Sequence, residues 1–298
     1  MAFSSSSSSS ANGDGKCHIR SVSLPSRSHP TTCSIEDALH RLKNFDTQNM
    51  STFESVSCGL AKLEDLYICT IDLLDMASTQ QILRRQVTCN STLLDSSVHL
   101  LDVCGIARDL VSQVKEDIQL LQSVLRRRKG DQGMSSILAD YVNFRNKARK
   151  TAKRLSLATN QIKNRANVTS PSDQDAESSA VMRTLMEVDE IAADIFQSVL
   201  RPFLNPISGT KKSRWSSILR LVHRGAVACE EKPENLDDIK HIDEAVRTLT
   251  KCNMDNIEAN KNQLQEVESN INSLELALES MFRQLVRARA SLLNVISQ

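Results

Sequence analysis

The stretch LLDVCGIARDLVSQVKEDIQLLQSVL, residues 100–125, places small and aliphatic side chains at alternating gaps of three and four residues. This alternation averages a period of about 3.5 residues, which is the period of a helix that buries one seam against another helix. We name this seam the first ladder, and its members are Leu100, Cys104, Ala107, Val111, Val114, Ile118, Leu121 and Leu125. The first ladder predicts a long helix that packs against a second helix.

A second ladder with the same spacing runs to the C-terminus. Its members are Leu264, Val267, Ile271, Leu274, Leu278, Met281, Leu285, Ala288, Leu292 and Val295. A helix of this length needs a long partner to bury its seam, so the two ladders predict helices packed side by side. Either ladder could instead pair with a second molecule, and a homo-oligomer therefore stays open.

The composition favours an all-α protein. The 298-residue chain holds only 8 glycines and 6 prolines, and 3% of its residues are aromatic, whereas many-stranded sheets need frequent turn residues and aromatic side chains. With 37 basic and 36 acidic residues the net charge is +1, so any attraction to a polyanion must come from a local patch. We expect an elongated helical bundle with long, antiparallel, coiled-coil-like helices.

The cysteines and the hydropathy pattern bear on location. The 8 cysteines are widely spaced, with no C-x-x-C pair and no secretory signal before them, which indicates a reducing compartment. No stretch of about 18 apolar residues is present, so no membrane-spanning helix is expected. We expect a cytoplasmic protein, with a plastid or the membrane periphery as alternatives, because a serine-rich start also suits a transit peptide.

The first 33 residues predict a disordered arm. They contain seven consecutive serines and few large apolar side chains, so they cannot bury enough surface to offset the entropy of ordering. Order is expected from Ser34, which can cap a first helix. Residues 34–298 then form the helical bundle, interrupted by loops at 167–175 and 202–213.

Capping patterns and apolar stripes predict the individual helices. Ser51 with Glu54 and Ser78 with Gln81 match the capping box that starts a helix. The expected helices cover 34–45, 51–75, 78–125 with a kink near Asn90, 135–167, 176–201 with an end before Pro202, a short amphipathic helix around Trp215, and one helix of more than 60 residues after Pro233. In the last helix the stripe shifts by one residue between Leu249 and Leu264, which predicts a bend or a local loss of packing there.

The arm contains a candidate phosphorylation site. In the string RSVSLP, Arg20 precedes Ser23 by three residues and Pro25 follows it by two, with Ser21 between them. A basophilic kinase prefers this arginine, and the pattern resembles the ligands of 14-3-3 proteins. A phosphate on Ser23 would add nearly two negative charges that an arginine cluster on such a phosphoserine reader could bind.

Residues 141–165 form a basic segment. They are rich in lysine and arginine, and no acid occurs from residue 141 to residue 172. Its cations predict a basic helical surface made of Arg145, Arg149, Lys150, Lys153 and Arg154. Such a surface could contact anionic lipid, calmodulin or an acidic protein. Alternatively it is a solvated face balanced by the acids of residues 187–194. Nucleic acid is not expected, because no aromatic residues alternate with these cations.

The sequence contains no pattern typical of an enzyme. H-E-x-x-H, G-x-S-x-G and a phosphate-binding loop are all missing. His99, His223 and His241 are isolated, and nothing in the sequence defines the partner and the cleft that a general base needs. Neighbouring acids such as Asp237 and Asp238 point to different faces of a helix. We therefore expect no catalytic residues, no metal site and no cofactor.

Several strings resemble the plant BYPASS-related proteins. They are HIRSVSLPSRSHP (18–30), LEDLY (63–67), STQQ (78–81), LDVCGIARD (101–109), LQSVLRRR (121–128) and ESMFR (279–283). The resemblance extends from about residue 18 to the end of the chain, apart from the region around 165–235. It implies a plant protein linked with root and shoot development, and it supplies no catalytic residues.

These observations lead to two functional hypotheses. The first is a non-enzymatic interaction or regulatory protein of plant root and shoot development, which binds a protein partner and is tuned by phosphorylation of Ser23. The alternative is a peripheral membrane protein that docks to anionic lipid through the basic helix 141–165.

Overall fold

The computed structural model describes residues 30–45, 47, 50–127, 134–168, 176–206, 238–250 and 257–297. These residues form eight helices and no strand, so the prediction of an all-α fold is confirmed. In chain order the helices are α1 (Pro30–Lys43), α2 (Phe53–Asp75), α3 (Ala77–Arg85), α4 (Val87–Arg127), α5 (Met134–Val168), α6 (Ala176–Leu204), α8 (Asp238–Thr250) and α9 (Ile257–Ser297).

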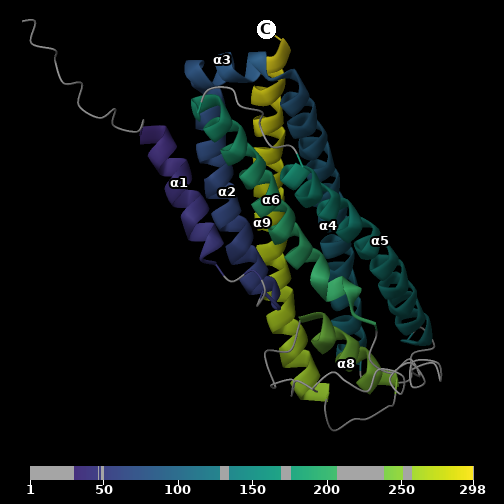
Figure 1. Cartoon of the computed structure of the whole chain (residues 1–298). Coiled ribbons are helices and arrows are strands. Elements are labelled where there is room, and N and C mark those ends of the chain that lie inside the picture. The colour runs from purple at the N-terminus through teal and green to yellow at the C-terminus, as the bar shows by residue number, and fades with distance from the viewer. Residues whose placement is uncertain are drawn as a thin grey trace, which may run out of the picture.

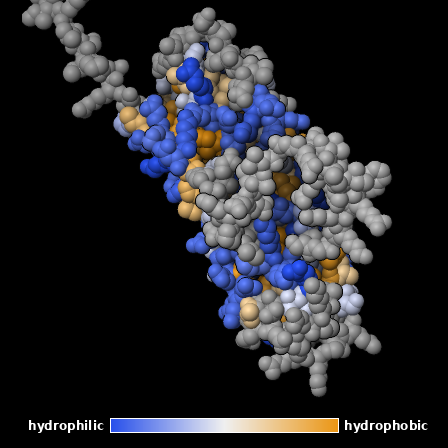
Figure 2. All heavy atoms as spheres, turned by 60° about the horizontal axis from the view of Figure 1, so that its bottom comes forward, coloured by the Kyte–Doolittle hydropathy of each residue, from blue (hydrophilic) through white to orange (hydrophobic). Residues whose placement is uncertain are grey.

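Four helices form the centre of the bundle (Figure 1). α2 and α4 each contact both α6 and α9, so α6 and α9 lie at opposite corners of a four-helix arrangement. Outside this centre, α1 packs against α2 and α6, and α5 packs against α4 and α6. α3 lies across the end of the bundle that holds the C-terminus, while α8 lies near the other end, against α5, α6 and α9. Figure 2 shows a described surface that is mostly hydrophilic, with hydrophobic side chains scattered over it.

The first ladder lies on α4 and the second on α9, and both face the core of the same bundle. Every member of both ladders is at most 9% exposed. Gln122, near the end of α4, donates to the carbonyl of Leu264 at 3.4 Å, whereas Leu94 near its beginning accepts from Arg289 at 2.8 Å. α4 and α9 are therefore antiparallel, as predicted. Both ladders are buried within one chain, so neither is exposed for a coiled coil with a second molecule.

The first helix begins earlier than predicted. α1 starts at Pro30, and the hydroxyl of Ser34 lies inside the helix, where it donates to the carbonyl of Pro30 at 3.0 Å. Proline suits a helix start because its missing N–H would find no partner there. The expected start at Ser34 is wrong, and residues 30–33 belong to α1. Residues 1–29 lie outside the described residues.

The capping boxes are also placed differently. α2 is capped by Thr52, whose hydroxyl accepts from the N–H of Ser55 at 3.2 Å while the Ser55 hydroxyl accepts from the N–H of Thr52 at 3.2 Å. The expected box of Ser51 with Glu54 is therefore one residue too early. α3 follows Met76, which provides no side-chain cap, so the expected box of Ser78 with Gln81 is wrong.

The helix predicted over 78–125 is two helices. α3 ends at Arg85, the next residue Gln86 has a φ of −107° and a ψ of 60° that depart from helical values, and α4 begins at Val87. Asn90 is buried and donates to the carbonyl of Leu83 at 2.6 Å, and the same carbonyl accepts from the N–H of Gln86 at 2.9 Å, so the Asn90 side chain joins the first turn of α4 to the last turn of α3. The expected kink near Asn90 is a complete break four residues earlier.

The prediction that a helix stops before Pro202 is wrong. α6 includes Pro202 and ends at Leu204. Leu200 and Phe203 are fully buried, and burying these side chains outweighs one missing N–H bond near the helix end. The loop expected at 202–213 therefore starts after α6, and its residues from 207 onward lie outside the described residues, as does the helix expected around Trp215. In the loop expected at 167–175, residues 167 and 168 belong to α5.

The C-terminal segment is not one continuous helix. α8 and α9 are separate elements, and α8 packs against α9 rather than extending it. The predicted bend between Leu249 and Leu264 falls where α8 ends and α9 begins. Because the apolar stripes of the two segments differ by one residue in phase, a straight helix could not bury both of them against the same neighbours.

Candidate functional site

The residues of the candidate phosphorylation site precede the part of the chain that the structure describes. Arg20, Ser21, Ser23 and Pro25 all lie before Pro30, so the structure gives no geometry for them. The basic segment on α5 is described almost completely, and its five predicted surface cations fall into two groups.

Arg145 does not belong to the basic surface. Its side chain is 1% exposed, and it makes two contacts with the carboxylate of Asp243 on α8, at 3.1 Å from Nε and 3.2 Å from Nη2. Its Nη2 also lies 3.4 Å from the carbonyl oxygen of Asn205, just after α6. The prediction that Arg145 is exposed is wrong, because this side chain joins three segments inside the bundle.

Tyr141 completes this buried cluster. Its hydroxyl donates to Asp243 at 2.6 Å, one turn of α5 before Arg145. Burial raises the pKa of Tyr141 well above its usual value, and the neighbouring Asp243 carboxylate raises it further. The phenol therefore stays protonated and serves as a hydrogen-bond donor. The sequence did contain a signal for this cluster, since Tyr141 and Arg145 are four residues apart and therefore lie on one face of a helix.

Arg149 is half-buried and acts at the end of α6. Its Nε donates to the carbonyl of Leu204 at 3.0 Å, so it satisfies one of the carbonyls that a helix leaves without a partner at its C-terminus. Further along α5, Lys163 pairs with Asp194 of α6 at 2.7 Å. Both contacts hold α5 against α6.

Four further cations of α5 form an exposed stripe. We define the α5 basic surface as the exposed side chains Lys147, Lys150, Lys153 and Arg154. None of them forms an ion pair with another described residue. Leu157, one turn beyond Lys153, is 66% exposed and extends the stripe with an apolar side chain.

The expected balance by acidic neighbours holds only in part. The acids expected to balance the cations lie at residues 187–194 of α6. Asp194 pairs with Lys163, Glu187 pairs with Lys43 of α1, and Asp189 accepts a hydrogen bond from Ser96 of α4. These acids therefore serve contacts other than the α5 basic surface. The α5 basic surface keeps its positive charge at the outer edge of the bundle.

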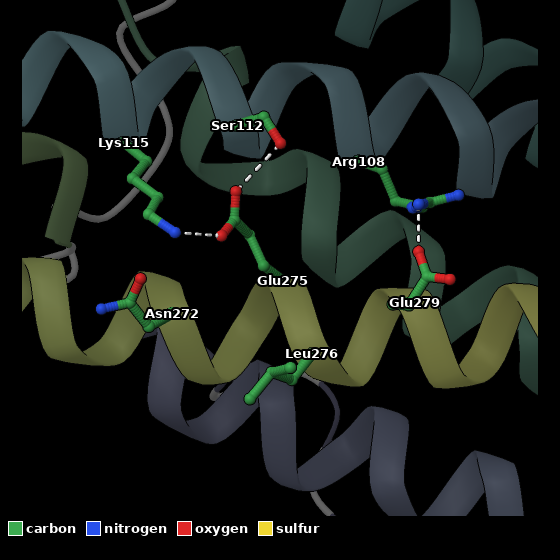
Figure 3. A pocket seen from close by; sticks show the side chains of 7 residues that line it. All are labelled: Arg108, Ser112, Lys115, Asn272, Glu275, Leu276 and Glu279. Atoms are coloured by element: carbon green, nitrogen blue, oxygen red, sulfur yellow. Dashed lines mark hydrogen bonds and ion pairs between the residues drawn. The ribbon is translucent and has the colours of Figure 1, made fainter.

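A hollow between α4 and α9 is lined by paired charges (Figure 3). Its volume is about 420 Å³. Glu275 of α9 accepts from Lys115 at 2.6 Å and from Ser112 at 2.9 Å, and Glu279 pairs with Arg108. These opposite charges neutralise each other, so the hollow provides neither a free base nor a concentrated charge.

A much smaller cavity, of about 40 Å³, lies between α2, α4, α6 and α9. Tyr67, Asp189 and Arg289 contribute polar groups to its lining. Burial raises the pKa of Asp189 to about 7, and a hydrogen bond from Ser96 opposes this shift. Pockets for organic ligands usually enclose about 300–1,000 Å³, so this cavity admits water and is too small for an organic substrate.

Cys104 lies on the first ladder, and burial raises its pKa to about 12, so its thiol is not activated as a nucleophile. Within the described ranges no three His, Cys, Asp or Glu side chains come together in a group that could hold a metal ion. None of the described helices is long and apolar enough to cross a membrane.

The comparisons with known proteins give a family match. The family model described as "Protein BPS1" matches residues 59–295, which is more than half of the 298-residue chain. The matched range begins in α2 and ends within α9, and it includes the α5 basic surface. No curated protein and no solved structure matches the chain.

Proposed function

The chain belongs to the BPS1 family, and from that premise we propose that it is a non-enzymatic interaction protein of plant root and shoot development. It acts by binding an acidic protein partner through the α5 basic surface. The observation that carries this proposal is the charge of that surface: four exposed cations lie on one helix, and no described acid pairs with them. We place this activity in the cytoplasm.

The apolar side of α5 is buried in the bundle, and this favours a protein partner over a lipid bilayer. Tyr141, Ala148, Ala152 and Leu155 are buried against the rest of the bundle. An amphipathic helix that binds a membrane inserts its apolar face below the headgroups, and α5 has already used that face in the core. The helix therefore offers a partner its charge, together with the single exposed Leu157.

Docking to anionic lipid is the second candidate, and the same charge supports it. Each Lys or Arg near an anionic membrane contributes about 1 kcal/mol, so four cations give a measurable and salt-sensitive attraction without insertion. This binding would place the protein at the membrane periphery.

One pair of triple variants tests both candidates. The test variant is Lys150→Glu/Lys153→Glu/Arg154→Glu. The control is Arg126→Glu/Lys240→Glu/Arg287→Glu, which makes the same charge change at exposed sites scattered over α4, α8 and α9. Arg145 is left unchanged in both variants, because its loss would damage the core.

The readouts distinguish the two partners. In affinity purification from plant tissue, proteins that the control retains and the test variant loses would support the protein partner. Equal recovery by both variants would contradict it. Pelleting with phosphatidylserine vesicles that is lost in the test variant and at high salt would support the lipid alternative, and pelleting unaffected by either would reject it.

Phosphorylation of Ser23 is the regulatory part of the proposal. Arg20 and Pro25 flank this serine as a basophilic kinase and a 14-3-3-type reader require, and the phosphate would recruit the reader to the arm. Mass spectrometry of the protein from plant tissue should find phosphate on Ser23. A Ser23→Ala variant should lose the reader but keep the partner of the α5 basic surface.

A further inference from the structure

The four central helices form four lateral grooves, and helices of the chain fill two of them. α1 lies against α2 and α6, and α5 lies against α4 and α6. Each outer helix also brings a lysine to an acid of α6, since Lys43 pairs with Glu187 and Lys163 pairs with Asp194. The grooves of this bundle thus accept amphipathic helices that carry cations along their edges.

No described helix covers the groove between α4 and α9. The contacts of Arg289 locate its upper part, because this side chain reaches the carbonyl of Leu94 at 2.8 Å and the hydroxyl of Ser97 at 2.6 Å. Val286 and Leu293 lie about one turn before and after Arg289 on the same side of α9. They are 46% and 42% exposed.

The α4 side of the groove is also apolar at this level. Val98, next to Ser97, is 39% exposed, and Leu101 follows it about one turn later. Phe282 of α9 lies below them, with its ring 5.1 Å from the guanidinium of Arg108. These side chains form an apolar patch between two helices, although most of the described surface is hydrophilic.

Gly105 lies on this face of α4, one turn before Arg108. A Cβ atom added to Gly105 would meet no heavy atom within 4 Å, so the backbone here borders open space. Below Gly105 the groove continues into the hollow of about 420 Å³ between Arg108, Lys115 and the glutamates of α9 (Figure 3). Leu276, which is 72% exposed, lines this lower part and points away from α4.

One edge of the groove is acidic. Asp95, Asp102, Asp109 and Glu116 recur every seven residues on α4, and all four are exposed. Residues seven apart lie on one line along a helix, so these acids form a ridge beside the groove. We call it the α4 acidic ridge.

We propose that the groove between α4 and α9 binds an amphipathic helix of a partner protein, whose apolar stripe is flanked by basic side chains. The apolar patch receives the stripe, and the α4 acidic ridge attracts the flanking cations. From Phe282 to Leu293 the patch extends over roughly 16 Å at 1.5 Å per residue, the length of three helical turns.

The same charges disfavour two other occupants. A second copy of the chain, placed symmetrically on this groove, would bring one α4 acidic ridge close to the other. An anionic membrane would be repelled by the ridge. The groove is separate from the α5 basic surface, so the partner helix is a second ligand and its failure would leave the proposed function intact.

The test uses the full chain and two designed peptides of 14 residues. Both peptides repeat leucine at helical spacing, and the first has lysine and the second glutamate at all other positions. Fluorescence anisotropy of the labelled peptides gives the dissociation constant for each. We expect the lysine peptide to bind at least tenfold more tightly than the glutamate peptide, and an equal affinity would overturn the proposal.

A steric variant tests the location. Gly105→Phe adds a ring in the groove at a position where a Cβ atom meets no heavy atom within 4 Å, and Ala61→Phe adds the same ring at an exposed position of α2. Circular dichroism should show that both variants keep the fold. The lysine peptide should bind at least tenfold more weakly to Gly105→Phe and normally to Ala61→Phe, whereas equal binding by both would overturn the proposal.

A charge exchange tests the ridge. In Asp102→Lys/Asp109→Lys the lysine peptide should lose affinity and the glutamate peptide should gain it, and no exchange would contradict the role of the ridge.

The chain has a single tryptophan, Trp215, outside the described residues. If the Trp215 emission changes in Gly105→Phe without peptide, the chain's own segment fills the groove and the partner proposal is wrong.

Discussion

Arg145 and Lys153 carry the same charge on the same helix, but they lie in opposite environments. Arg145 is 1% exposed and bound to Asp243, while Lys153 is exposed and has no ion-pair partner among the described residues. The sequence predicted the basic character of both residues correctly. It could not separate them, because the acid that draws Arg145 inward is on α8, 98 residues away.

This difference predicts unequal effects of the same substitution. Arg145→Met should lower the free energy of unfolding by about 3–5 kcal/mol, because it leaves the Asp243 carboxylate buried without its cation. Lys153→Met should change it by less than about 0.5 kcal/mol, since the side chain is exposed. Urea unfolding followed by circular dichroism measures both values. Similar values for the two variants would contradict the assignment of Arg145 to the core.

Two glycines of helix interiors provide a second comparison. Gly105→Ala should raise the free energy of unfolding by about 1 kcal/mol, because alanine favours the helix and its Cβ meets only open space. Gly59→Ala should gain less, since its Cβ would lie 2.8 Å from Sδ of the buried Met50 and that side chain must shift. Thermal unfolding of both variants measures the difference. A larger gain at residue 59 would show that the packing around Met50 is wrong.

At the scale of the element, periodicity predicted more than capping did. The spacing of both ladders identified the buried sides of α4 and α9, because burying a whole stripe stabilises a helix far more than one terminal bond does. The helix starts were less well predicted. The capping box of α2 was expected at Ser51 and Glu54, but Thr52 and Ser55 form it. In both pairs a hydroxyl residue precedes its partner by three positions, so the spacing could not decide between starts that differ by one residue.

The second ladder makes a prediction within a single helix. Leu278→Ala should lower the free energy of unfolding by about 2–5 kcal/mol, because Leu278 is 0% exposed and its loss leaves a cavity. Leu276→Ala, two residues away, should change it by less than about 0.5 kcal/mol, since Leu276 is 72% exposed. Guanidinium unfolding of the two variants provides the measurement. Equal losses would mean that α9 is rotated from its position in this structure.

For the whole molecule, the small cavity between the four central helices links stability to pH. The folded protein raises the pKa of Asp189 from 3.8 to about 7 through burial, so the folded state holds this proton more tightly than the unfolded state does. The contribution of Asp189 to stability is therefore fully present below about pH 4 and is lost as the pH rises through about 7. Asp117, with its pKa raised to about 6 by burial, acts in the same direction.

We expect Asp189→Asn to reduce this dependence. The wild-type free energy of unfolding should fall between about pH 6 and about pH 8, and the variant should fall less because its amide does not titrate. Asp65→Asn, at an exposed position of α2, is the control and should keep the wild-type slope. Urea unfolding at both pH values measures the slopes. Equal slopes for wild type and Asp189→Asn would show that this carboxyl is ionised in the folded protein.

The assembly state is a further property of the whole molecule. Both ladders are buried within one chain, so the protein does not need a second copy to cover them. Light scattering in the absence of partners should give a mass close to the 33.2 kDa of one chain. A mass of two chains at low concentration would mean that another surface, rather than the ladders, holds a dimer.

The sequence by itself determined the helical class, the buried side of each long helix and the concentration of cations on α5. These properties depend on the order of residues within one helix, where a spacing of three or four decides which side chains share a face. The family resemblance, with residues 59–295 now matched, was also visible in local strings.

Only the tertiary structure decided which side chains meet across helices. It paired Arg145 with Asp243, left Lys147, Lys150, Lys153 and Arg154 without a described partner, and placed the α4 acidic ridge beside an uncovered groove. These contacts join residues far apart in the chain, and they depend on how the helices rotate and cross as their apolar faces pack. A local pattern determines which face of a helix is buried, but the neighbour that covers it is chosen when the whole chain packs.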